Sequence, residues 1–184
     1  MNNLQDGNKF LAALDCDSAI AVYTDIIDRR IAKKQYPSAG VYAQRGYALS
    51  FKEEKEDEIY KKAIEDCSKA LALLPNHSRK RYRILRVRAY AYYLQGQYEK
   101  AVTDCTVIIQ AITNTTSNPK TQAAARAQLA FVYELLGSIY LNRKQYSEAI
   151  SNFRKALEIY RPGQVISQGI IEKYKEACKK FNNN

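Results

Sequence analysis

The feature that most constrains this chain is a block of sequence that recurs four times. Each copy places an aromatic residue or a cysteine three positions before an alanine, and a bulky or soft side chain four positions after it. Steps of three and four residues keep side chains on one face of a helix, so each block predicts an amphipathic helix. Recurrent helical units predict a chain built by stacking. The anchoring alanines are Ala19, Ala63, Ala101 and Ala149.

A second helical segment precedes each block and pairs a small residue with a large one three positions later. A small side chain lets two backbones approach closely, so each upstream helix is expected to pack against the block that follows. The small residues are Gly7, Gly46, Ala89 and Gly137.

The fourth unit resembles a tetratricopeptide repeat, because its apolar and small residues stand where that family places them. These residues are Tyr133, Leu136, Gly137, Tyr140, Tyr146, Ala149, Phe153 and the closing Pro162. The resemblance covers about residues 3–162 and implies an all-α fold, a right-handed superhelical array of about four helix pairs in a single domain, residues 1–184. The expected repeats span approximately 3–36, 38–76, 78–112 and 119–162.

The other units depart from this pattern in two ways. Arg45 and Arg88 stand where Leu136 stands in the fourth unit, and the anchoring alanines are 44, 38 and 48 residues apart, against a usual repeat of about 34. The extra length is expected in residues 31–40, in the charged run from Lys52, and in the polar stretch from Thr113. That last stretch ends in Asn118 and Pro119, which predict a helix cap and the first residue of a long helix.

The segment after Pro162 predicts one more amphipathic helix, over residues 164–181. Ile170, Tyr174, Cys178 and Phe181 fall on one stripe, and lysines occupy the remaining faces. Helical arrays need a terminal element with one solvated face, so this helix is expected to cap the core.

No residue pattern predicts catalysis, and neither a cofactor nor a metal site is expected. The four cysteines lie 51, 38 and 73 residues apart, which provides no paired-cysteine motif, and they are expected as reduced thiols packed like small hydrophobes. His77 belongs to a predicted turn, and no phosphate-binding loop or nucleophile motif is present. The acidic run from Glu53 to Glu58 is expected to be a solvated edge between helices.

Charge and hydropathy bear on partners and location. The net charge is +10, and residues 79–124 carry 8 basic groups against 2 acidic ones, which raises the expectation of an anionic partner. No apolar run approaches the roughly 18 residues of a membrane span, and the N-terminus lacks a secretion signal. A cytoplasmic location is therefore expected, and the oligomeric state is left open.

The resemblance implies a function in protein–protein interaction, because in this family the first helices of the pairs line a concave surface that binds peptides. A non-enzymatic adaptor is therefore expected, with a partner segment held in a peptide-binding groove. Residues one or two steps around each helix from the core positions should face that groove. The predicted groove residues are Asn8, Gln44, Tyr47, Arg83, Arg86, Tyr90 and Tyr93.

Some co-chaperones of this family grip a C-terminal carboxylate with a five-residue clamp of Lys, Asn, Asn, Lys and Arg. The corresponding residues here are Leu4, Asn8, Gln44, Arg83 and Val87. One is identical, two are substituted by related chemistry and two are apolar. A general carboxylate-binding surface is therefore expected instead of the standard clamp.

The densest charge in the chain is the segment from Arg79 to Arg88. Three interpretations are open: a solvated helix whose long stems cover apolar neighbours, a contact for an acidic or carboxylate-terminated peptide, or a site for RNA or another polyanion such as lipid headgroups. The peptide is the preferred ligand, and nucleic acid is the alternative.

Overall fold

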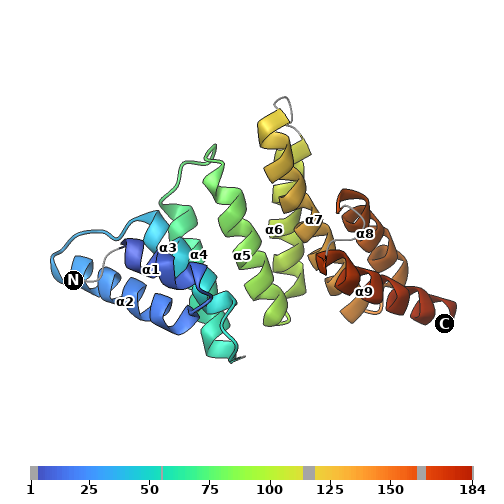
Figure 1. Ribbon diagram of the computed structural model, residues 1–184, viewed down its shortest axis with the longest axis horizontal. Coiled ribbons are helices and arrows are strands. Elements are labelled where there is room, and N and C mark those ends of the chain that lie inside the picture. Colours follow the sequence, from blue (N-terminus) through green and yellow to red (C-terminus); the bar gives the residue numbers. More distant parts are fainter. Residues whose placement is uncertain (1–3, 55, 114–118, 161–164, 184) are drawn as a thin grey trace. The chain divides into compact units, whose positions relative to one another are not determined.

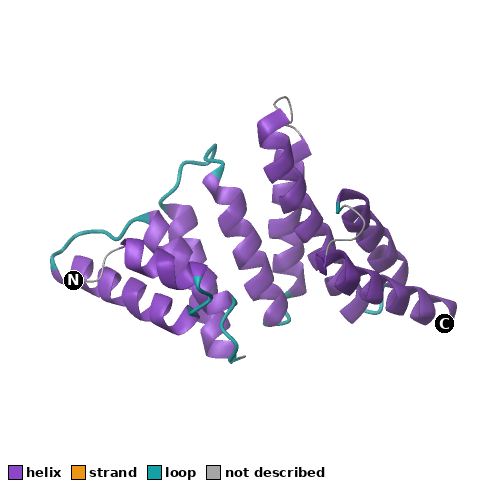
Figure 2. Cartoon of the chain, viewed as in Figure 1, coloured by secondary structure: helices purple, strands orange, loops and turns teal. Residues whose placement is uncertain are grey.

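A computed structural model describes residues 4–54, 56–113, 119–160 and 165–183. Over these residues the chain forms nine α-helices and no strand, which confirms the predicted all-α class (Figures 1 and 2). The chain divides into two compact units, residues 1–97 and 98–184. The handedness of the array and the single domain remain predictions.

The first unit contains α1 (Leu4–Ala12), α2 (Cys16–Ala32), α3 (Ala39–Ser50), α4 (Asp57–Ala72) and α5 (Lys80–Leu94). Consecutive helices pack on one another, and α3 also contacts α1 and α5. By contrast, α2 and α4 share no contact among the residues described for this unit. The helices α1, α3 and α5 therefore form one layer, and α2 and α4 lie outside it.

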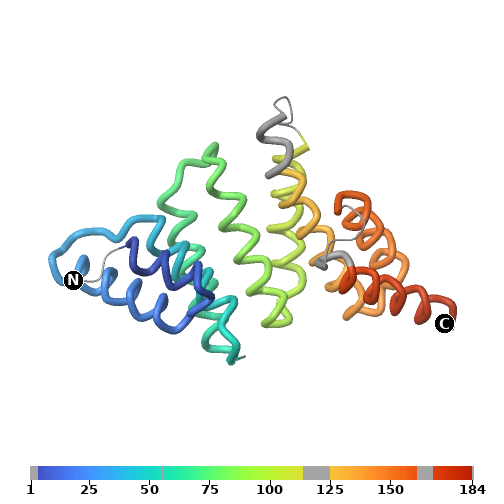
Figure 3. Tube along the Cα trace, in the orientation of Figure 1, coloured from blue at the N-terminus to red at the C-terminus, as the bar shows by residue number. Residues whose placement is uncertain are grey.

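The second unit contains α6 (Tyr98–Thr113), α7 (Pro119–Asn142), α8 (Tyr146–Ile159) and α9 (Val165–Asn182). The long helix α7 packs against α6, α8 and α9, and α9 lies mainly along α8 (Figure 3). The predicted long helix that starts at Pro119 is confirmed, whereas Asn118 lies outside the described residues.

The recurrent blocks form the helices α2, α4, α6 and α8, and within the two units α2, α4 and α8 each pack on the helix that precedes them. The four anchoring alanines lie in α2, α4, α6 and α8 and are 0% exposed. Residues 33–38, 51–54 and 56 lie between helices and fall in or beside two of the expected insertions, and residue 55 is not described. The third insertion falls mostly on residues 114–118, which are also outside the described part of the chain.

Glycines in three first helices make the close approaches that the sequence predicts. A Cβ added at any of them would lie 2.5–2.9 Å from a side chain of the second helix, closer than real Cβ contacts. A Cβ at any of these positions would force the facing side chain to shift. The closest approaches are Gly7 to Tyr23 at 2.5 Å, Gly46 to Cys67 at 2.9 Å and Gly137 to Phe153 at 2.6 Å.

The final helix packs on the last pair, and its stripe is buried over part of its length. Ile170 and Ala177 are buried in one cluster with Phe153, and Tyr174 packs against it. Phe181, expected on the same stripe, is 53% exposed, because it lies in the last turn of α9, past this cluster. Lys173 extends from α9 to α7, with Nζ 3.0 Å from Oε1 of Glu134.

Candidate ligand-binding groove

A groove of about 550 Å³ opens on the α1–α3–α5 layer of the first unit. It receives side chains from all three helices, because the first helices of successive pairs contact one another there. We call it the cationic groove. The residues that define it are Leu4, Asn8, Gln44, Tyr47, Arg83 and Val87.

Four of the seven predicted groove residues line this groove: Asn8, Gln44, Tyr47 and Arg83. The five residues at the positions of the family's carboxylate clamp all line it as well. The side chains that the alignment of the repeats selected thus surround one space. Their part in binding remains a prediction.

The other three predicted residues, Arg86, Tyr90 and Tyr93, are half-buried and are not among the lining residues. The two tyrosines belong instead to a row of aromatic rings that begins at the groove. Tyr47 lies 4.6 Å from Phe51 between ring centroids, Phe51 stacks on Tyr90 at 5.2 Å, and Tyr90 lies 6.3 Å from Tyr93.

Phe51 is the functional candidate that sequence reasoning missed. It directly follows the last residue of α3 and is 41% exposed. Projection onto a helical wheel stops at the helix end, so Phe51 was outside its reach. The sequence did contain a signal for Phe51. A large aromatic residue stands directly before a run of charged residues, and such a run favours exposure of its neighbours to solvent.

Hydrogen bonds fix the amide of Asn8 at one wall of the groove. Its Oδ1 accepts from Oη of Tyr23 at 2.9 Å and from Nε2 of Gln44 at 3.1 Å. Burial raises the pKa of Tyr23 to about 12, so its hydroxyl remains a neutral donor at pH 7. With Oδ1 engaged, Asn8 has its Nδ2 hydrogens to offer a ligand.

Two cations, Lys80 and Arg83, line the groove, and no lining residue is acidic. Both are exposed, and no ion pair engages either of them within the described part of the chain. The guanidinium carbon of Arg83 lies 6.0 Å from the ring centroid of Tyr47. This cation–π distance orients the guanidinium over a groove wall while its N–H donors remain accessible.

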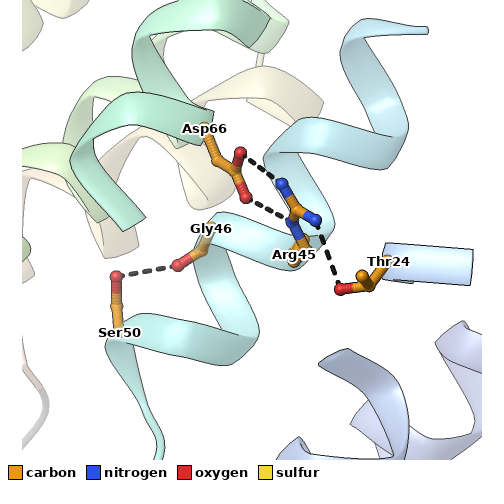
Figure 4. Close-up of polar contacts among 5 residues, drawn as sticks. All are labelled: Thr24, Arg45, Gly46, Ser50 and Asp66. Carbon is orange, nitrogen blue, oxygen red and sulfur yellow. Dashed lines mark hydrogen bonds and ion pairs between the residues drawn. The ribbon is translucent and has the colours of Figure 1, made fainter. Parts of the chain in front are cut away.

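A buried ion pair holds α3 in the orientation that lines the groove (Figure 4). Nε and Nη2 of Arg45 donate to the two carboxylate oxygens of Asp66 at 2.6 and 2.9 Å, and Nη1 donates to Oγ1 of Thr24 at 3.2 Å. One side chain of α3 therefore ties α2 and α4 together. Burial lowers the pKa of Arg45, but the bonds and charge of Asp66 outweigh it and leave the pKa above its ordinary value.

The arginine-rich segment serves the fold as well as the surface. Nη1 of Arg81 donates to the carbonyl oxygens of Leu71 and Leu74 at 2.6 and 2.9 Å, which caps the C-terminal end of α4. Nη1 of Arg88 donates to Oγ of Ser68 at 3.1 Å. Two arginines of the cluster are thus engaged by α4 and the turn that follows it.

The described residues contain no group of three His, Cys, Asp or Glu side chains that could hold a metal ion. Their helices also include none with the length and apolarity to cross a bilayer. His77 is exposed in the turn between α4 and α5, as predicted.

Comparison with known proteins gives one family match, and no curated protein matches the chain. The model described as tetratricopeptide repeat matches residues 130–162. That segment includes the second half of α7 and all of α8, the pair in which Gly137 meets Phe153. The resemblance to the tetratricopeptide repeat family is thereby confirmed for the fourth unit, and this family indicates a protein–protein interaction module.

Proposed function

We propose that the cationic groove binds an extended segment of a partner protein that presents a carboxylate to Lys80 and Arg83. The observation that carries the proposal is the lining itself: two exposed cations and no acidic residue, on a layer formed by three first helices. Such a groove is sufficient for a non-enzymatic adaptor, which has only to bind its partner. A cytoplasmic location and a co-chaperone-like role are extensions of the same proposal.

The groove has polar groups that can bind the ligand's carboxylate and apolar side chains that can contact the rest of the segment. The guanidinium of Arg83 can hold a carboxylate with two parallel hydrogen bonds, and the amide of Asn8 adds donors. Leu4 and Val87 replace charged residues of the family's clamp with apolar ones. The ligand is therefore expected to supply aliphatic side chains beside its carboxylate.

The alternative ligand is RNA or another polyanion, favoured by the excess of basic residues in α5. Polyanion binding draws on many spread contacts. Arg81 and Arg88 already bond to α4 and the turn after it, which reduces the number of arginines in α5 that are available for phosphates. The peptide reading is therefore preferred.

The test compares Arg83→Ala with a matched control on the same helix end, Arg79→Ala, because Arg79 is exposed but does not line the groove. The probe is a fluorescein-labelled hexapeptide with aliphatic central residues and a C-terminal aspartate, measured by fluorescence anisotropy. Arg83→Ala should weaken binding about tenfold or more, since a charge-assisted hydrogen bond contributes about 1.5–3 kcal/mol. Arg79→Ala should bind like the unchanged protein.

A single-stranded oligouridine serves as the second probe and tests the alternative that the groove binds RNA. The binding of both probes is measured at two salt concentrations. Equal losses in the two variants, or tighter binding of the oligouridine with a steep salt dependence, would contradict the peptide groove. Amidation of the peptide's C-terminus then separates a terminal carboxylate from an acidic side chain as the anchor.

A further inference from the structure

A second pocket adjoins the cationic groove, with a volume of about 430 Å³. Tyr47 lines both spaces. The apolar part of this pocket includes Leu14, which is 85% exposed, and Phe51, which is 41% exposed. We call it the acidic pocket, because its rim carries the side chains of Asp15, Asp17, Glu53 and Glu54.

The acidic pocket is opposite in charge to the groove beside it. Lys52 is the one cation among its lining residues, and its Nζ lies 3.0 Å from Asp17 and 2.7 Å from Glu54. Four carboxylates therefore face one ammonium group. The pKa of the Cys16 thiol is raised by burial first and then by the charges of neighbouring carboxylates, as a negative site requires.

The two spaces lie at opposite ends of α3. Ala39 and Gly40, in the first turn of the helix, line the cationic groove, and Phe51, just past its end, lines the acidic pocket. A helix carries partial positive charge at its N-terminus and partial negative charge at its C-terminus. The helix therefore adds to the same difference in charge that the side chains create.

Further cations strengthen the positive end. A smaller pocket shares Leu4 and Ser38 with the cationic groove and is lined by Arg30 and Lys33. The surface thus passes from basic to acidic along the length of α3, with the rings of Tyr47 and Phe51 at the acidic end.

The length of α3 sets the spacing that a ligand must match. The eleven-residue step from Gly40 to Phe51 corresponds to about 16 Å at 1.5 Å per residue. The guanidinium carbon of Arg83 lies 6.0 Å from the ring centroid of Tyr47, so the ligand has less than this length to cover. An extended peptide covers about 3.3 Å per residue, so at most about five residues span the distance.

We infer that the partner segment is bipolar: it carries a carboxylate at its C-terminal end, a basic residue up to about five positions earlier, and an apolar residue between them. The carboxylate lies at Lys80 and Arg83, the basic residue at Glu53 and Glu54, and the apolar residue on Tyr47 and Phe51. This inference rests on the proposed function of the groove, and charge complementarity selects the occupant.

The experiment uses four hexapeptides with a C-terminal aspartate and aliphatic central residues. The first position carries lysine, alanine or glutamate, and in the fourth peptide the lysine is moved next to the aspartate. On the unchanged protein the lysine peptide should bind most tightly. Replacement of its lysine by glutamate should weaken binding about three- to tenfold, which is the range of a few exposed charge pairs.

A charge reversal in the protein tests where the basic residue lies. Glu53→Lys with Glu54→Lys should reverse the preference, so that the glutamate peptide binds better than the lysine peptide. The matched control is Glu65→Lys, an exposed position of α4 that lines neither space, and it should leave the preference unchanged. Circular dichroism checks that each variant folds.

The outcomes separate this inference from the proposed function. If all four peptides bind alike and Arg83→Ala still weakens them, the groove stands and the bipolar ligand is wrong. If the moved lysine binds as well as the original, or the Glu65→Lys control shifts the preference equally, the pocket does not select the basic residue. If none of the peptides binds, both proposals fall.

Discussion

Two helix pairs of this protein make the same close approach with different chemistry. In α3 and α4, Gly46 meets Cys67, and the residue before the glycine is Arg45. In α7 and α8, Gly137 meets Phe153, and the residue before the glycine is Leu136. Arg45 and Leu136 are each 6% exposed. The same buried position thus holds a charge in one pair and an aliphatic side chain in the other.

The difference shows which parts of the pattern are required for packing. The glycine is needed in both pairs, because a Cβ would collide with the facing side chain. The neighbouring position tolerates a charge only where an oppositely charged side chain lies within bonding distance, as Asp66 does for Arg45. Helix packing therefore depends on complementarity at this position more than on its hydrophobicity.

The largest expected effect comes from Asp66→Ala, which removes the partner and leaves a buried guanidinium unpaired. Breaking a buried ion pair in this way costs about 3–5 kcal/mol. The free energy of unfolding, measured by urea denaturation followed by circular dichroism, should fall by that amount.

A double substitution tests whether an apolar contact can replace the ion pair. Arg45→Leu combined with Asp66→Leu gives α3 and α4 an apolar contact like that of α7 and α8. Apolar replacement of a whole buried pair is often neutral or stabilising, so the double variant should recover most of the loss. A double variant as unstable as Asp66→Ala would mean that the charge itself is needed.

A smaller effect is expected from Gly137→Ala. Its Cβ would lie 2.6 Å from the ring of Phe153, and overpacking of this kind costs about 1–3 kcal/mol, partly offset by the better helix propensity of alanine. Phe153→Leu in the same chain should relieve the clash. At Gly46 the carbonyl oxygen of Ala63 lies 3.2 Å from the added Cβ, so trimming Cys67 to alanine should relieve Gly46→Ala only in part.

A pH-dependent effect concerns Cys105, which occupies in α6 the place of Phe153 in α8. Burial raises the pKa of its thiol to about 12 from an ordinary 9.0. The folded state disfavours the thiolate, so the stability from this group is complete below pH 9 and declines as the pH rises toward 12. Urea denaturation of the unchanged protein and of Cys105→Ala should show a difference that shrinks over this range. A constant difference would contradict the burial of the thiol.

The sequence predicted the elements well because helices follow from local periodicity. The four helices formed by the recurrent blocks, their buried alanines and the glycine contacts all depend on residues three or four positions apart. The same projection placed Asn8, Gln44 and Arg83 around one groove, since turns of neighbouring first helices come together once the pairs stack.

What the sequence did not reveal depends on how elements meet in space. Arg45 was recognised as a departure, but its partner Asp66 lies 21 residues away, and only the rotation of α4 against α3 brings the two together. Phe51 and the acidic residues after it lie in a loop whose path no periodicity encodes. A buried arginine does demand a carboxylate, and that demand was the signal that sequence reasoning left unused.

The ion pair of Arg45 and Asp66 also constrains how this repeat can evolve. An apolar pair at these positions is physically acceptable, but reaching it requires two substitutions. Either single step strands a buried charge at a cost of about 3–5 kcal/mol, a large share of the roughly 5–15 kcal/mol that keeps a domain folded. Selection therefore removes the intermediates, and a lineage that has acquired the pair retains it even without any benefit to binding.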